Sequence, residues 1–148
     1  MFDKFTFHWN VLREKGRITN EEYKAATFAQ HYRTVKEFCK PFEDYNSLVY
    51  KSGLRLMSCS TKLTDCPYRL EYEKNKDKIS SEKFANNLIP TMRSWSETVF
   101  RTALKDREEN QINDIVNEFY NSYQQEIVKN PEGHAMDYIH IIMEIEKI

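Results

Sequence analysis

The residue types that could carry chemistry gather on one predicted helix. The stretch NLIPTMRSWSETVF, residues 87–100, sets Met92 and Trp95 beside Arg93 and Glu97. Arg93 and Glu97 stand four residues apart, which predicts an ion pair on the helix surface worth about 0.2–0.5 kcal/mol. We expect this structural role for the pair rather than a catalytic one.

Four histidines offer the other familiar route to catalysis or metal binding, namely His8, His31, His134 and His140. None of them stands in a metal-binding or general-base pattern such as H-E-x-x-H. The three cysteines are odd in number, and no two have the spacing of metal ligands. We therefore predict no catalytic residue, no metal site and no disulfide framework.

The helix through Trp95 has an apolar face whose purpose the spacing alone leaves open. Apolar residues recur at helical spacing, namely Phe84, Leu88, Met92, Trp95 and Val99. Such a face is either a core element or, in part, the wall of a pocket. Pro90 is expected to kink this helix or to restart it as a first-turn residue.

Composition describes a globular chain with balanced charge. The 148 residues predict one domain, and 30% of them are charged while 40% are apolar, including 14% aromatics. With 22 basic and 23 acidic residues interspersed, the chain has no electrostatic signature for nucleic acid or an anionic membrane. No apolar run has the length of a membrane span and the start has no signal-peptide pattern, so we expect a cytoplasmic protein.

Along the chain, capping and periodicity predict a mixture of helices and two strands. Expected features are a helix ending at Gly16, a cap at Thr19 or Asn20, a cap at Thr34 before a helix that breaks near Pro41, and a helix over 43–53. A strand follows at 54–63, then a solvated connection over 71–84 with a cap at Ser80 or Ser81, then long helices and a strand at 138–146. In the last strand Ile139 and Ile141 face one way and Tyr138 the other. A terminal strand with this many apolar residues indicates that it belongs to a larger sheet.

Four segments in order resemble one family. The stretch VLREKGRITNEEYKAATFAQHYRTVKEF is similar to a helix pair and helix entry of the S-adenosylmethionine-dependent carboxyl methyltransferases of the SABATH type. SGLRLMSCSTKLTDCPYR resembles the strand that follows, MRSWSETVF the next helix, and FYNSYQQEIVKNPEGHAMDYIHIIMEIEK the closing helix and last strand. The likeness covers nearly the whole of this chain, and it corresponds to the C-terminal half of the proteins in that family.

The resemblance implies an α/β fold, α+β for this chain alone, made of the helix-rich C-terminal half of a class I methyltransferase with its last two strands antiparallel. It implies a methyltransferase-like protein that recognises a small-molecule carboxylate, with Met92, Trp95, Tyr138 and, more loosely, Tyr32 lining the substrate pocket. A carboxylate is already nucleophilic, so such an enzyme needs alignment and exclusion of water more than acid or base groups. Met92 and Trp95 have the alternative of a purely core role.

The cofactor half of that family is not encoded here. Its S-adenosylmethionine site needs a Gly-rich turn, whereas the three glycines of this chain, Gly16, Gly53 and Gly133, are far apart. We therefore expect no binding of S-adenosylmethionine by this chain alone, and as partners an N-terminal methyltransferase half or a second copy. Two other interpretations stay open: a non-catalytic binding or interaction domain, and an unrelated α+β domain whose aromatics are core.

Overall fold

The computed structural model describes residues 2–29 and 31–148, and these residues divide into two compact units. The first unit holds the chain up to Phe28 and Asp65–Met136, and the second holds Ala29–Thr64 and Asp137–Ile148. The first is helical and the second carries the sheet, so the fold is of the α+β kind. None of the helices in the described part of the chain is long and apolar enough to cross a membrane.

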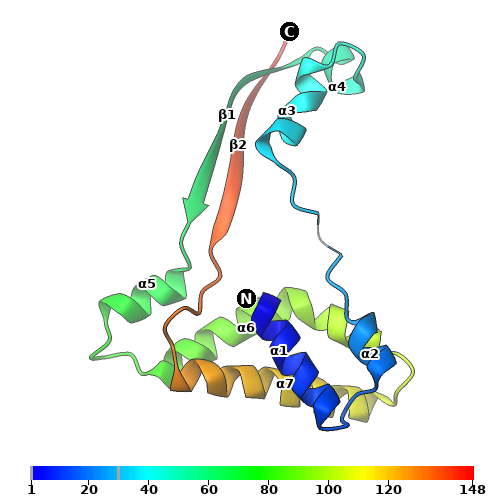
Figure 1. The fold of residues 1–148 in the computed structure, drawn as a ribbon. Coiled ribbons are helices and arrows are strands. Elements are labelled where there is room, and N and C mark those ends of the chain that lie inside the picture. The colour runs from blue at the N-terminus through cyan, green and yellow to red at the C-terminus, as the bar shows by residue number, and fades with distance from the viewer. Residues whose placement is uncertain (1, 30) are drawn as a thin grey trace. The chain divides into compact units, whose positions relative to one another are not determined.

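The first unit is built from α1 (Phe2–Glu14), α2 (Asn20–Ala25), α5 (Pro67–Lys74), α6 (Ser81–Ala103) and α7 (Glu109–Lys129). The long helices α6 and α7 pack on each other, and α1 packs on α7 (Figure 1). Their buried faces form one aromatic-rich core in which Phe5, Phe100 and Phe119 are each at most 1% exposed. Packing in this core therefore fixes helices α1, α6 and α7 against one another.

The second unit consists of α3 (Val35–Glu43), α4 (Leu48–Lys51), β1 (Leu54–Thr64) and β2 (Tyr138–Lys147). As predicted, the two strands pair antiparallel, from Leu54 opposite Lys147 to Thr64 opposite Tyr138, with an irregularity between Leu56 and Ser58 (Figure 1). At the turn before β1, Gly53 has φ +84°, and a Cβ there would lie 2.6 Å from the Ile148 carbonyl oxygen. The sheet has these two strands only within the described residues.

Helix starts follow the sequence closely. Thr19 and Thr34 each close a capping box, with Glu22 and Glu37 respectively, and the Ser80 side chain accepts from the Lys83 N–H. Gly16 ends α1 with φ +68°. These predictions are confirmed. Each was predictable because it depends on a few neighbouring residues only.

The two proline predictions have different outcomes. α3 ends at Glu43, two residues after Pro41 and close to the predicted break. α6 runs through Pro90 without a restart, and a kink there stays a prediction. On either side of Pro90, Leu88 and Met92 are fully buried, while Pro90 itself is on the exposed face. Packing of the buried face thus offsets the missing backbone hydrogen bond to Asn86, which is itself an exposed residue.

Two further boundaries differ from the sequence expectation. The helix expected over 43–53 is shorter, because the Asp44 carboxylate accepts from the Asn46 N–H in a turn and Ser47 then caps α4. The expected solvated connection begins as helix α5, because Tyr72 stacks on Phe84 with ring centroids 4.9 Å apart. A tertiary contact therefore extends order into a stretch whose composition is that of a loop.

Candidate functional site

The four residues expected to line a pocket are divided between the two units. Met92 is fully buried in the core of the first unit, and Trp95 is half-buried beside it. In the second unit, Tyr138 begins β2 and Tyr32 precedes α3, with exposed fractions of 47% and 75%. Their convergence on one cavity therefore stays a prediction.

Trp95 belongs to a cluster of aromatic rings. Its ring centroid lies 5.8 Å from that of Phe5 and 6.0 Å from those of Phe2 and Phe28. Its Nε1–H donates to the Met136 sulfur at 3.3 Å. One edge of Trp95 is thus fixed by α1 and Phe28, and its polar end by a residue just before β2.

The same aromatic cluster borders a small cavity of the first unit, which we call the Trp9 cavity. Its volume is about 220 Å³, and its walls are Phe5, Thr6, Trp9, Tyr23, Lys24, Ala26, Phe28 and Phe100. Phe5 stacks on Phe28 at 5.7 Å, and Trp9 contacts Phe100 at 4.8 Å between ring centroids. The cavity therefore has aromatic and polar walls contributed by α1, α2, α6 and the segment after α2.

One ion pair and one cation–π contact hold the α2 wall of the Trp9 cavity. The guanidinium of Arg107 binds the Glu22 carboxylate with contacts of 2.5 and 2.7 Å, and this hydrogen bonding lowers the pKa of Glu22. The Arg13 guanidinium lies 4.6 Å from the centre of the Tyr23 ring. Short as it is, α2 is therefore anchored both to α1 and to the connection between α6 and α7.

Among the described residues, the indole N–H of Trp9 is a buried donor without a partner. Trp9 is 2% exposed, and among the described residues no acceptor lies within hydrogen-bond reach of its Nε1–H. Of the described residues lining the cavity, Lys24 alone carries a charge, and it is exposed. Sequence reasoning missed this site, although Phe2, Phe5 and Trp9 recur at helical spacing near the start of the chain.

A second cluster of polar side chains joins α1 to α7. His8 is 4% exposed; its Nε2 lies 2.6 Å from a Glu126 carboxylate oxygen and its Nδ1 lies 3.0 Å from the Ser122 hydroxyl. Lys4 also bonds Glu126, and the Nε2 of buried His134 lies 3.9 Å from the same carboxylate. Burial lowers the pKa of both histidines despite the nearby negative charge.

The order serine, imidazole, carboxylate is that of an activated nucleophile, but the location of Ser122 argues against acyl transfer. Ser122 lies inside α7, where the backbone N–H groups are used by the helix itself. Those groups therefore cannot stabilise an oxyanion beside the hydroxyl. The cluster fits best as a tie between α1 and α7.

Arg93 and Glu97 form the predicted surface ion pair. The Arg93 Nε donates to Glu97, and Arg101, one turn further along α6, donates to the same carboxylate at 3.1 Å. These hydrogen bonds lower the pKa of Glu97. Arg101 also bonds Asn113 of α7 at 2.9 Å, so the pair is part of a network that joins the two long helices.

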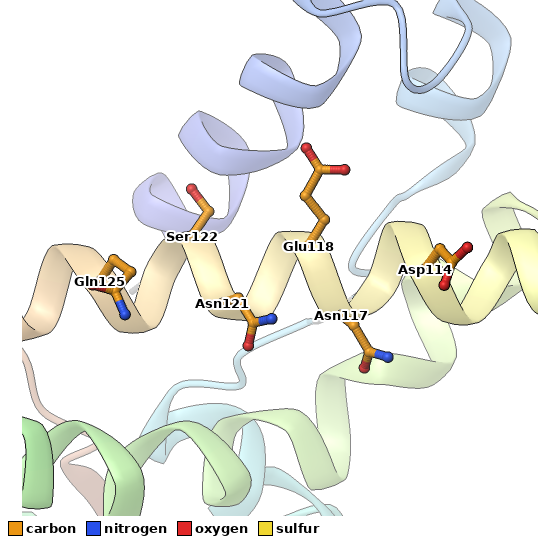
Figure 2. A pocket seen from close by; sticks show the side chains of 6 residues that line it. All are labelled: Asp114, Asn117, Glu118, Asn121, Ser122 and Gln125. Atoms are coloured by element: carbon orange, nitrogen blue, oxygen red, sulfur yellow. The ribbon is translucent and has the colours of Figure 1, made fainter.

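A hollow of about 460 Å³ follows the exposed side of α7 (Figure 2). Its six lining side chains are polar and all come from that helix: Asp114, Asn117, Glu118, Asn121, Ser122 and Gln125. Figure 2 shows Glu118 and Ser122 leaving α7 on the side of α1. With no apolar side chain among its lining residues, this hollow lacks the character of a small-molecule site.

Comparison with known proteins leaves these sites to be interpreted from their own geometry. No protein-family model matches the chain, and no curated protein sequence matches it.

Proposed function

We propose that this chain is the substrate-recognition half of an S-adenosylmethionine-dependent methyltransferase acting on a small-molecule carboxylate. The observation that carries the proposal is the antiparallel pairing of β1 with β2. The intervening segment, residues 65–137, contributes the two long helices that pack on each other. The resemblance in sequence implies this arrangement of a last strand pair with helices between the two strands.

The exposed apolar residues of the strands also support a role as part of a larger sheet. Ile139 is 76% exposed, Ile142 is 51% exposed and Leu63 is 59% exposed, although the alternation puts Ile139 and Ile142 on opposite faces. A two-stranded sheet is marginal by itself, and apolar residues on both faces are typical of strands covered on both sides. A cofactor-binding half would supply the missing strands and cover.

In this proposal the pocket residues have unequal roles. Full burial of Met92 suits a residue that holds α6 in place, whereas half-buried Trp95 has a face left for a substrate. Tyr138 and Tyr32, which are exposed, are the other two residues that the resemblance assigns to substrate binding. Together these rings would orient the carboxylate toward the methyl group and exclude water, which is the main requirement of the reaction.

A non-catalytic interaction domain is the second candidate. The absence of a Gly-rich cofactor turn from the sequence favours it, as do the exposed isoleucines of β2, which a partner would cover. In that case the aromatic clusters are core only. The two candidates differ in whether methyl transfer appears when a cofactor-binding half is supplied.

Methyl transfer is tested by joining the chain to the N-terminal, cofactor-binding half of a carboxyl methyltransferase. S-adenosylmethionine with a labelled methyl group is then incubated with a panel of small aromatic and aliphatic carboxylic acids. Labelled methyl ester is expected from the joined protein and from neither half alone. A joined protein that binds the cofactor yet esterifies none of the acids would favour the interaction domain.

A further inference from the structure

The two cysteines of the second unit lie where α3 packs on β1. Among the described residues of α3, Cys39 alone is buried, with 8% of it exposed. From Met57 to Thr64 every residue of β1 is exposed except Cys59, which is half-buried. On both elements, burial therefore marks the cysteine as the point of contact.

The two thiols also interact directly. Hydrogen bonding to the Cys59 thiol, followed by burial, raises the pKa of the Cys39 thiol. Both cysteines are free in this structure. A disulfide requires two side chains that point toward each other across a short gap. Thiols that share a hydrogen bond already have this arrangement.

The pair divides into a reactive and a resolving cysteine. Thiol–disulfide exchange begins with a thiolate that a small reagent can reach. Cys59 is the more exposed of the two, whereas Cys39 is buried and its raised pKa keeps it protonated at neutral pH. Cys59 is therefore suited to the first attack and Cys39 to the second. The third cysteine, Cys66, belongs to the first unit and is only 1% exposed, so it lacks access.

We propose that Cys39 and Cys59 are a reversible redox pair, in which a small disulfide such as glutathione disulfide links α3 covalently to β1. The Cys59 thiolate attacks one sulfur of glutathione disulfide, which forms a mixed disulfide and releases one glutathione. Cys39 then loses its proton and attacks the Cys59 sulfur, which forms the Cys39–Cys59 bond and releases the second glutathione. The two cysteines are oxidised and glutathione disulfide is reduced. In a reducing compartment such a bond is transient and redox-sensing rather than structural.

The inference goes beyond the proposed function, because both cysteines belong to the second unit and the exchange needs no cofactor-binding half. In the test, the full chain is incubated with glutathione disulfide and the remaining free thiols are then blocked by alkylation. Digestion with trypsin separates all three cysteines, because it cuts after Lys51 and after Lys62. Mass spectrometry of the digest identifies which cysteines are linked.

A linked pair of peptides containing Cys39 and Cys59 is expected, and dithiothreitol should separate them. Cys66→Ser is the matched control and should form the same link. Cys39→Ser should stop with one glutathione bound to Cys59, because the resolving thiol is missing. In Cys59→Ser, Cys39 should react at least about tenfold more slowly than Cys59 does in the original protein, since it is buried and protonated. Circular dichroism checks that the variants fold.

Hydrogen exchange tests what the link does to the second unit. In the linked form the α3 amides should exchange at least about tenfold more slowly than in the reduced form, because the link holds α3 on β1. Unchanged exchange would overturn this effect. The redox pair itself would be overturned by a disulfide to Cys66, by a disulfide between two chains, by a Cys59 that keeps its glutathione in the original protein, or by a chain that glutathione disulfide leaves unmodified.

Discussion

At the scale of single residues, Met92 and Trp95 show how the same helix face can contain a core residue and an exposed-edge residue. The buried positions of α6 continue at intervals of four as Phe84, Leu88, Met92, Ser96 and Phe100, with Ser96 fully buried. The Ser96 hydroxyl satisfies its polarity through the Met92 carbonyl at 2.7 Å and the Tyr120 hydroxyl at 2.6 Å. The sequence hides this continuation, because a serine interrupts the apolar pattern while Trp95 continues it at helical spacing.

Truncation of these two residues should separate their roles. Met92→Ala removes a fully buried side chain and should lower the free energy of unfolding by about 2–5 kcal/mol. Trp95→Ala should cost less than the about 3–5 kcal/mol of a fully buried aromatic truncation, since Trp95 is only half-buried. Urea unfolding of both variants measures the difference. In the joined methyltransferase Trp95→Ala should also change KM or substrate choice, and an unchanged KM would assign Trp95 to the core.

Stability should fall on mild acidification because of His8 and His134. Burial lowers the pKa of both below the ordinary 6.5, so between the lowered value and 6.5 the unfolded chain binds more protons than the folded one. The free energy of unfolding is therefore highest above about pH 6.5 and decreases below it, by at most about 1.4 kcal/mol per pH unit for each histidine. Urea unfolding between pH 8 and pH 5 measures the slope.

The matched variants for this slope are His8→Gln and His31→Gln. His8→Gln cannot take up a proton beside Glu126 and should flatten the slope, whereas His31, whose side chain is 76% exposed, serves as the control. Burial raises the pKa of the Glu126 carboxyl, but its bonds to Lys4 and His8 together outweigh burial and lower it, so a further loss of stability is expected as the pH falls below 4.5. Stability that is constant or rises from pH 7 to pH 5 would contradict the burial of neutral histidines.

At the scale of elements, local signals predicted well and signals that depend on packing did not. Thr19, Thr34 and Ser80 were predictable as caps because the bonds of a cap lie within three residues. The strand pair was predictable from alternation in β2 and from the resemblance. Order in α5 and the walls of the Trp9 cavity depend on residues far apart in the sequence, such as Tyr72 with Phe84 and Phe5 with Phe28.

Pro90 tests how far packing overrides helix propensity. Pro90→Ala restores a backbone donor on the exposed face of α6 without changing a buried side chain. Proline is about 3 kcal/mol less favourable than alanine inside a helix. The free energy of unfolding of the variant should therefore be about 1–3 kcal/mol higher than that of the original protein. A thermal melt and urea unfolding measure the gain. Loss of stability in Pro90→Ala would show that the proline shapes α6 in a way its neighbours require.

At the scale of the whole molecule, the chain contains a well-packed helical unit and a two-stranded sheet that leaves several of its apolar side chains exposed. The aromatic core of the first unit is closed, whereas Tyr138, Ile139 and Ile142 of β2 are exposed in the second. The sequence of one chain does not indicate what covers these residues, because a partner contacts the surface and leaves no signal in the local periodicity of the sequence. The proposed answer is the cofactor-binding half of a methyltransferase.

Hydrogen exchange along β2 tests that central claim most directly. In the chain alone, the β2 amides that point away from β1 have no strand partner among the described residues and should exchange fast. Joining the chain to a cofactor-binding half should slow their exchange by at least about tenfold, as they enter a ladder with a new strand. The β2 amides already bonded to β1 are the internal control. Fast exchange of the outer amides in a joined protein that has folded and binds S-adenosylmethionine would contradict the completion of a methyltransferase sheet by this chain.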